Sequence, residues 1–179
     1  MNSVITIFGS SVPEENSPDY TTAYNVGRTL GKAGMTICNG GYGGTMEASA
    51  KGAREVGGKT LGITVSTWPR KSNPWIQQEL KQPSLFERLM KLVEMGNAYV
   101  ILPGGSGTLL ELACVLELVN KGIIDRKPIV LVGGFWDGVM DSLRREPGSS
   151  TGNDSTRLVH KVQTPEELLE YLEKSLPPS

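Results

Sequence analysis

Short apolar runs alternate with longer amphipathic segments along the chain, and this alternation restricts the fold more than any other feature. Six runs rich in β-branched residues have the length of strands: 4–8, 35–38, 60–65, 98–103, 127–133 and 156–162. Segments with helical spacing follow them: 19–34, 46–56, 84–96, 108–122, 136–146 and 164–176. Because short, apolar strands are typical of a sheet covered on both faces, the pattern predicts an α/β fold. We expect a Rossmann-like open parallel sheet with helices on both faces.

The chain has 179 residues and shows no internal repeat or long linker, which predicts a single nucleotide-binding domain over residues 1–179. The final segment, 156–162, is expected to be an edge strand. A polar and aromatic segment, 66–83, is expected to form a long loop. The Gly-, Ser- and Asn-rich stretch 147–155 predicts a flexible loop, and residues 177–179 a tail.

Composition excludes several classes of protein. Eighteen basic and nineteen acidic residues are mixed along the chain without a basic stripe, which argues against a nucleic-acid polymer as partner. No apolar run approaches the roughly 20 residues of a membrane helix, and the first residues lack the features of a signal peptide. With one His and two Cys, neither a zinc site nor a disulfide framework is expected. We therefore expect a cytoplasmic protein without a metal.

Two glycine-rich turns each follow a predicted strand and precede a helix: "NGGYGGT" at 39–45 and "PGGSGT" at 103–108. Glycine lets a ligand approach the main chain, and the free N–H groups of the following helix favour an anion such as phosphate. Tight structural turns would explain one such motif more easily than two. Neither turn is a Walker A loop, and "FGSSVP" after the first strand lacks GxGxxG, which disfavours a dinucleotide bound in the usual NAD manner.

Three helix starts have the Ser/Thr-x-x-Glu spacing of a capping box: Ser84 with Glu87, Thr164 with Glu167, and Thr108 with Glu111. Glu111 could therefore be a cap, a catalyst or both. Glu47 has an alternative as well, because the helix dipole favours an acid near a helix N-terminus. Taken alone, Arg88 is typical of a solvated helix surface.

Aromatic side chains occur close to these turns. Trp68, Trp75 and Tyr42 lie in or near loops, where they could stack on a base or pack the loop against the domain. We favour a binding role for one of the two tryptophans.

The stretch "PGGSGTLLE" at 103–111 fits the pattern PGGxGTxxE, which resembles that of the Lonely Guy (LOG) proteins and their SLOG-superfamily relatives. The similarity extends over most of the chain, through "FGSS", "NGGYGGTMEASAKGA" and "ERLMKLVEMGNAYVILPGG". The "GGTMEA" form is most similar to an uncharacterised bacterial and archaeal branch. Two positions depart from the pattern: Leu89 replaces a lysine, and Glu47 replaces a residue that is glycine in the plant-like members.

The resemblance implies a nucleoside 5′-monophosphate N-glycosidase, or phosphoribohydrolase, that releases a free base and ribose 5-phosphate without a cofactor. It implies Glu111 and Arg88 as catalytic residues, with Glu47 as a further candidate. AMP or a modified AMP would be the ligand. The expected substrate-binding residues belong to the three loops after strands: Gly9, Ser10, Ser11, Gly40, Gly41, Gly43, Gly44, Thr45, Pro103, Gly104, Gly105, Ser106, Gly107 and Thr108.

Two other functions stay open at this point. One is a non-catalytic protein that binds or carries a nucleotide-like ligand or the molybdenum cofactor, as relatives of the family do. The other is a structural dimer whose glycine turns are only turns. The label "lysine decarboxylase", often given to the family, is rejected because no motif nominates a lysine for pyridoxal phosphate. The resemblance also implies a homodimer or higher homo-oligomer, with helices 84–96 and 108–122 as candidates for its apolar interface.

Overall fold

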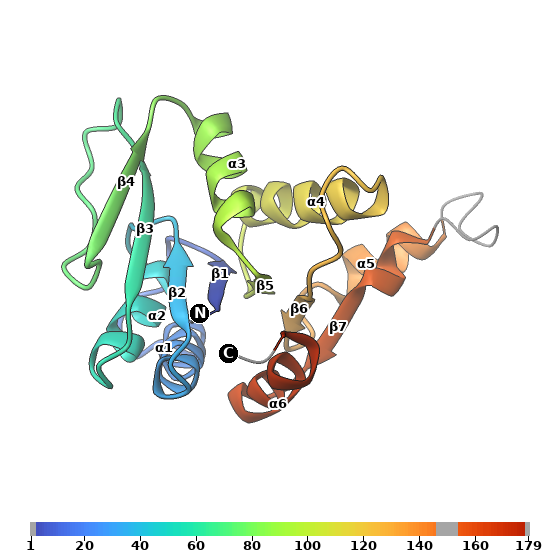
Figure 1. The fold of residues 1–179 in the computed structure, drawn as a ribbon, viewed down its shortest axis with the longest axis horizontal. Coiled ribbons are helices and arrows are strands. Elements are labelled where there is room, and N and C mark those ends of the chain that lie inside the picture. Colours follow the sequence, from blue (N-terminus) through green and yellow to red (C-terminus); the bar gives the residue numbers. More distant parts are fainter. Residues whose placement is uncertain (1–2, 146–153, 178–179) are drawn as a thin grey trace.

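A computed structural model describes residues 3–145 and 154–177. Strands and helices alternate along the chain, as the apolar pattern predicts (Figure 1). The strands are β1 (Val4–Phe8), β2 (Thr36–Asn39), β3 (Thr60–Val65), β4 (Gln78–Gln82), β5 (Ala98–Ile101), β6 (Ile129–Val132) and β7 (Val159–Val162). The helices are α1 (Pro18–Lys32), α2 (Thr45–Arg54), α3 (Leu85–Met95), α4 (Ser106–Asn120), α5 (Asp137–Arg144) and α6 (Pro165–Ser175), with the 3₁₀ turn η2 at Ser155–Leu158.

All seven strands pair in parallel in one sheet, in the order β4-β3-β2-β1-β5-β6-β7. The expected sixth strand is β7, and it lies at one edge of the sheet. The opposite edge is a strand that the sequence does not predict. Part of the segment expected to be a loop, 66–83, forms β4, whose Leu80 aligns with Ile63 of β3. The expectation was wrong because "QELKQ" has a single apolar residue and exposed polar neighbours.

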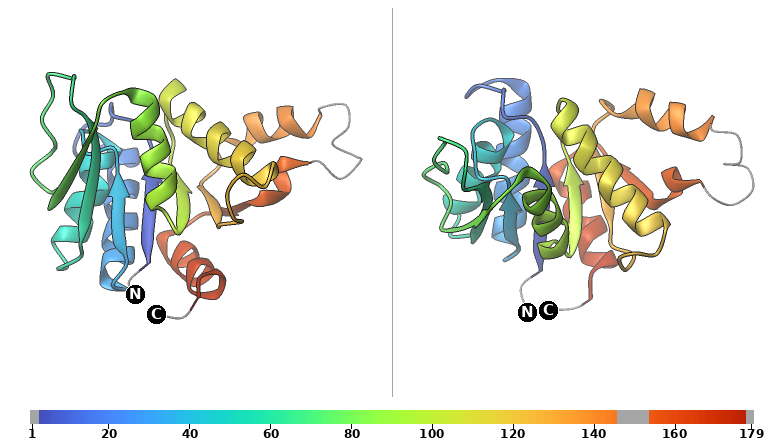
Figure 2. Two further views of the ribbon diagram at one scale, coloured as in Figure 1. Left: turned by 45° about the horizontal axis from the view of Figure 1, so that its top comes forward. Right: turned by 90° about the horizontal axis from the view of Figure 1, so that it is seen from above.

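Helices cover both faces of the sheet (Figure 1, Figure 2). Helices α1, α2 and α6 pack on one face around an apolar cluster that includes Ile5, Leu30 and Leu172. Helices α3, α4 and α5 pack on the other face around a second cluster that includes Phe8, Leu92 and Leu112. The five inner strands, β1, β2, β3, β5 and β6, are almost wholly buried, which explains their continuous apolar character.

Helices α1 and α2 approach each other closely because glycines stand at their contact. A Cβ atom at Gly27 would lie 1.9 Å from the Ser49 carbonyl oxygen, and one at Gly52 would lie 2.1 Å from that of Tyr24. Any larger residue would push the two helices apart. The glycine at the end of α1, Gly34, has a φ of 78°, which is the left-handed conformation that commonly ends a helix.

Local capping also follows the sequence. At α3, the Ser84 hydroxyl accepts a hydrogen bond from the Glu87 N–H and also bonds the Glu87 carboxylate. At α6, the Thr164 hydroxyl accepts from the Glu167 N–H, and the Glu167 carboxylate accepts from the Gln163 N–H. The expected N-caps Ser84 and Thr164 are therefore confirmed. The two glutamate side chains bond the Ser84 hydroxyl and the Gln163 N–H, and not the backbone N–H of the N-cap residue as in a full capping box.

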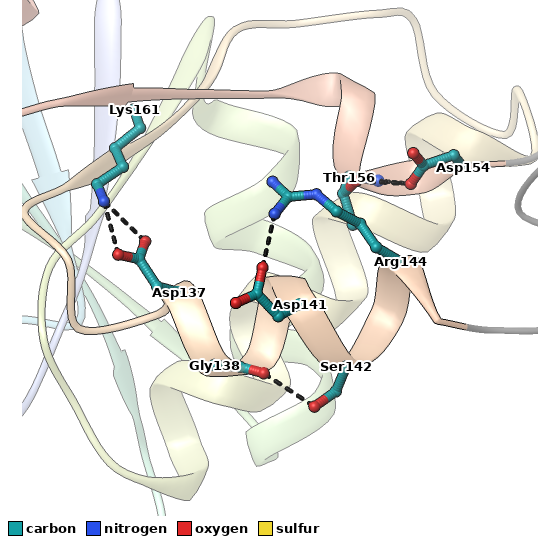
Figure 3. A network of polar contacts seen from close by, with 8 residues as sticks. All are labelled: Asp137, Gly138, Asp141, Ser142, Arg144, Asp154, Thr156 and Lys161. Carbon is teal, nitrogen blue, oxygen red and sulfur yellow. Dashed lines mark hydrogen bonds and ion pairs between the residues drawn. The ribbon is translucent and has the colours of Figure 1, made fainter.

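Polar contacts join α5 to the edge strand β7 (Figure 3). The Lys161 ammonium contacts both carboxylate oxygens of Asp137, at 2.7 and 2.8 Å. At the start of η2, the Asp154 carboxylate accepts hydrogen bonds from the N–H and hydroxyl of Thr156. Most of the loop expected at 147–155 lies outside the described residues, as does the tail beyond residue 177. No helix in the described part of the chain is both long and apolar enough to cross a bilayer.

The chain reverses its direction of travel across the sheet at β1. From β1 it proceeds through β2, β3 and β4 toward one edge, and it then returns to β5 on the other side of β1. The loops that leave the carboxyl ends of β1 and β5 therefore diverge and leave a crevice between them. In open α/β sheets this is the place where ligands bind.

Candidate functional site

A cleft of about 410 Å³ lies at the carboxyl end of the strands, at this reversal point. Loops after β1, β2, β3 and β5 line it, together with the first turns of α2, α3 and α4. The lining residues are Gly9, Ser10, Ser11, Val12, Tyr42, Met46, Trp68, Arg70, Leu85, Arg88, Gly105, Ser106, Gly107, Thr108 and Glu111. The three predicted loops thus converge on one site, although each contributes in a different way.

The β5 loop brings the N-terminus of α4 to the cleft. Helix α4 begins at Ser106, and its N-cap residue, Gly105, makes no side-chain capping hydrogen bond. The first N–H groups of an α-helix have no partner within the helix and carry its positive dipole end. Because Gly105 and Gly107 lack side chains, an anion can approach these amides from the cleft. A Cβ atom at Gly104 would lie 2.2 Å from the Thr108 hydroxyl, so that position also requires glycine.

Glu111 is not a capping residue. The N-cap is Gly105, which makes Thr108 the third residue of α4 and places Glu111 well inside the helix. Its side chain lines the cleft and is only 14% exposed. Burial raises the pKa of the Glu111 carboxyl to about 7, although the charge of Arg88 acts in the opposite direction. Near neutral pH this carboxyl can therefore both hold and release a proton.

Arg88 lies beside Glu111, with 3.9 Å between Nη1 and the carboxylate Oε1. It projects from α3 into the interior, where Nε donates a hydrogen bond of 2.8 Å to the Ile63 carbonyl. Burial lowers the pKa of the guanidinium, and the charge of Glu111 raises it. The side chain is buried, so the interpretation of Arg88 alone as a surface residue was wrong.

Gly40 and two aromatic rings enclose the Arg88 guanidinium. A Cβ atom at Gly40 would lie 1.7 Å from Nη2, so only glycine leaves space for the arginine. The guanidinium carbon lies 5.6 Å from the centre of the Tyr42 ring and 6.0 Å from that of Trp68. At such distances a cation is attracted to an aromatic face. Gly40 thus does not line the cleft but makes room for a residue that does.

The loop after β1 closes the middle of the cleft. The Ser10 N–H donates to the Pro103 carbonyl, which links this loop to the β5 loop. The Ser10 carbonyl accepts hydrogen bonds from both the N–H and the hydroxyl of Thr45, at 2.9 and 3.0 Å. A Cβ atom at Gly9 would lie 2.4 Å from the same hydroxyl. Pro103 and Thr45 therefore hold the loop in place, whereas Gly9, Ser10 and Ser11 face the cleft.

The turn at 39–45 differs from its expected role as an amide cradle. The Gly41 N–H donates to the Asn39 side chain at 2.8 Å, and the Thr45 N–H is bound to Ser10. Gly41, Gly43 and Gly44 do not line the cleft. Left-handed φ angles at Gly41 and Gly44 turn the backbone instead, and the turn brings the Tyr42 ring and Met46 to the cleft wall.

Glu47 does not line the cleft. Its charge acts on Tyr20 of α1: burial raises the pKa of that phenol, and Glu47 raises it further. The spacing along α2 explains the difference, because Met46 faces the cleft and its neighbour projects elsewhere. The expectation of Glu47 as a second carboxylate in the site is not supported by its position.

Side chains that the motifs did not nominate complete the wall. Trp68 and Arg70 come from the connection between β3 and β4, Leu85 from the start of α3, and Met46 from α2. Trp68 is one of the aromatic residues that the sequence placed near the turns. Trp75 lies instead beside Lys51, whose ammonium nitrogen is 5.8 Å from the centre of the Trp75 ring. Arg70 and Leu85 had no sequence signal, because neither belongs to a spaced motif.

Among the described residues, no group of three His, Cys, Asp or Glu side chains is arranged to hold a metal ion. The cleft offers the N-terminus of α4, the guanidinium of Arg88 and the Glu111 carboxyl, whose pKa is raised. An open parallel sheet with such a cleft at its reversal point places the protein in the Rossmann-like class, in which ligands bind at this end of the sheet.

A family described as "possible lysine decarboxylase" matches residues 46–172. The chain belongs to this family, which is the PGGxGTxxE family of the LOG and SLOG proteins. It is 33% identical, over 134 residues, to an uncharacterised protein of Archaeoglobus fulgidus, covering 73% of this chain and 84% of that protein.

Two further comparisons agree with this family and with the fold. The chain is 32% identical over 145 residues to a pyrimidine/purine nucleotide 5′-monophosphate nucleosidase of Escherichia coli, matching 74% of this chain but only 31% of that enzyme. The solved structure of the molybdenum cofactor binding protein from Rippkaea orientalis superposes with a TM-score of 0.75 at 22% identity, covering 97% of each chain. At that identity the second comparison shows a shared fold.

Proposed function

We propose that the protein hydrolyses the N-glycosidic bond of a nucleoside 5′-monophosphate, releasing a free base and ribose 5-phosphate. The observation that carries the proposal is the meeting, in one cleft, of an open helix N-terminus, Arg88, and the buried carboxyl of Glu111. The name of the E. coli relative describes the same chemistry. The molecule offers an anion site and an ionisable acid within the length of one small cleft.

The 5′-phosphate would bind the first amides of α4. The N–H groups at the start of this helix are directed to the cleft between Gly105 and Thr108, without a side-chain cap to compete for them. The ribose would then lie toward Glu111, which is on the same helix. Arg88 would hold the substrate by charge-assisted hydrogen bonds from nitrogens that the Ile63 carbonyl does not occupy.

The bond to the base breaks through a ribose with oxocarbenium character. Water adds to C1′, the electron pair of the C1′–N bond leaves with the base, and the proton lost by the water balances the charge on the base. An ionised Glu111 beside the ring would stabilise the positive charge or orient the water. Since the pKa of Glu111 is about 7, we expect activity that depends on this carboxylate to rise with pH through that value.

Direct measurement of base release tests the proposal. Purified protein is incubated with AMP and with N6-substituted AMP analogues, and the free base is followed by chromatography. We expect base release by the wild type and a loss of at least about 100-fold in Glu111→Gln, the range typical of an acid–base group. Glu117→Gln is the matched control, because it lies on the same helix with an exposed side chain. Equal turnover by wild type and Glu111→Gln would contradict the role of Glu111.

The alternative is a protein that binds or carries a nucleotide-like ligand or the molybdenum cofactor without reaction. The same incubation separates the two functions, because a carrier would bind AMP and release no base. A structural dimer with no ligand predicts a third result, in which nucleotides cause no shift in thermal stability.

We further propose that the protein forms a homodimer through α3 and α4. These helices lie side by side on one face of the sheet (Figure 1, Figure 2). Both expose apolar side chains. Phe86 is 70% exposed, and Met90, Leu109 and Leu110 are also exposed. A surface of this kind marks an interaction site. Sedimentation of the wild type and of Phe86→Asp would test it, with a dimer expected for the first and a monomer for the second.

A further inference from the structure

One wall of the cleft is aromatic and apolar, and its residues come from α2, α3 and the loops after β2 and β3. It consists of Tyr42, Met46, Trp68 and Leu85, with Arg70 beside them. The rings of Tyr42 and Trp68 stack with their centres 5.6 Å apart and their planes at 30°. We call these four apolar residues the aromatic wall.

The wall is held rigidly from behind. The Tyr42 hydroxyl accepts a hydrogen bond of 3.0 Å from the Val65 N–H of β3. Asn73 donates from its side chain to the carbonyls of Gly41 and Tyr42, at 3.1 and 2.8 Å. These bonds tie the connection after β3 to the turn after β2. Trp68 is still 38% exposed, so part of its indole surface is available to a ligand.

The wall offers ring surface and almost no hydrogen-bonding pattern. Tyr42 is buried with its hydroxyl oxygen at Val65, and Met46, Trp68 and Leu85 carry no strong acceptor. Arg70 is exposed and can only donate. Hydrogen bonds that must compete with water contribute little, whereas stacking on an aromatic side chain does not depend on which groups the base carries at its edge.

We propose that the base of the nucleotide stacks on the exposed face of the Trp68 indole, which Tyr42 supports from the other side, and that the site selects for ring area and not for the groups at the edge of the base. The inference rests on the proposed function in that it places a nucleotide in this cleft. Its consequence is a tolerant site: AMP and GMP bind with similar affinity, and a single-ring base such as that of UMP binds more weakly. Trp68 is then the residue that determines specificity.

The test measures equilibrium binding to the full chain carrying Glu111→Gln, so that no turnover disturbs it. The probes are AMP, GMP, UMP and ribose 5-phosphate. In this background we expect AMP and GMP to agree within about tenfold. Adding Trp68→Ala is expected to weaken both by about 5- to 100-fold, the cost of one lost base stack. Ribose 5-phosphate, which has no base, should change by less than about twofold.

Two further variants separate stacking from a general structural effect. Trp68→Phe keeps a ring at the wall and should restore most of the affinity for AMP. Trp75→Ala removes a tryptophan from the same connection, but one that lies over Lys51 and outside the cleft, and it should leave binding unaltered. Urea denaturation of each variant shows whether its fold is intact.

The inference is overturned if AMP and GMP differ by more than tenfold, if Trp68→Ala weakens ribose 5-phosphate as much as AMP, or if it weakens neither nucleotide. These results are distinct from a failure of the proposed function. Binding that depends on Trp68 without base release by the wild type would end the proposed hydrolysis and leave the stacking site standing. Base release that is indifferent to Trp68 would do the reverse.

Discussion

Replacing Glu111 with glutamine is expected to change how the stability of the protein depends on pH. Burial raises the pKa of this carboxyl from its ordinary value of 4.5 to about 7 in the folded state. The folded protein therefore binds the proton more tightly than the unfolded chain does. The stability that this proton contributes is fully present below pH 4.5 and is lost as the pH rises through about 7. Glutamine has no such proton to lose.

The size of the effect follows from the difference between the two pKa values. A rise from 4.5 to about 7 corresponds to about 3 kcal/mol over the whole titration, and to about 2–3 kcal/mol between pH 5 and pH 8. The Glu111 side chain is only 14% exposed, so solvent screening reduces this value little. Relative to the wild type, Glu111→Gln should therefore gain about 2–3 kcal/mol of unfolding free energy on going from pH 5 to pH 8.

Urea denaturation of both proteins at pH 5, 6, 7 and 8 measures this quantity. Groups that titrate equally in the two proteins cancel in the difference between them. Glu117→Gln provides the control, because it makes the same substitution at an exposed position of the same helix. A difference for Glu111→Gln that stays flat within about 0.5 kcal/mol, or that falls with pH, would show that the carboxyl is not held in a desolvated position.

Two further substitutions, one of them with a matched control, test the packing and hydrogen bonds that support the cleft. Gly52→Ala should lower the unfolding free energy by about 1–3 kcal/mol or more, because its Cβ atom would lie 2.1 Å from the Tyr24 carbonyl oxygen. The control is Gly138→Ala, where the added Cβ atom would meet nothing within 4 Å, and which should raise the unfolding free energy by about 0.5–1 kcal/mol. Equal stability of the two variants would contradict the close contact between α1 and α2. Asn73→Ala removes the donor to the Gly41 and Tyr42 carbonyls, so we expect a loss of about 1–3 kcal/mol and a smaller thermal shift with AMP than the wild type shows.

The sequence predicts the fold in most respects because the features that decide it are local or periodic. Apolar runs mark the buried strands, and the capping residues Ser84 and Thr164 act on their own helices. The edge strand β4 is different. Its polar side chains give no strand pattern, and the strand forms because its backbone pairs with β3, a contact that the local sequence does not show.

The site could be located from the sequence but not assembled from it. Two glycine turns identify the right end of the sheet, yet the direction of each amide depends on partners elsewhere in the fold. The Gly41 N–H is bound by Asn39, and Gly40 leaves space for the Arg88 guanidinium. The N-terminus of α4 also differs from the capping-box spacing: the N-cap is Gly105, three residues before Thr108. Glu111 thereby becomes available to a ligand.

The glycine contact between α1 and α2 has a mechanical consequence for the distant end of the domain. With Gly27 and Gly52 against backbone atoms of the facing helix, the two helices lie in direct backbone contact, and any side chain added there would force them apart. The first residue of α2, Thr45, donates two hydrogen bonds to the Ser10 carbonyl, from its N–H and from its hydroxyl. A substitution that forces α1 and α2 apart would therefore displace Thr45 and, through it, the loop after β1 that lines the cleft.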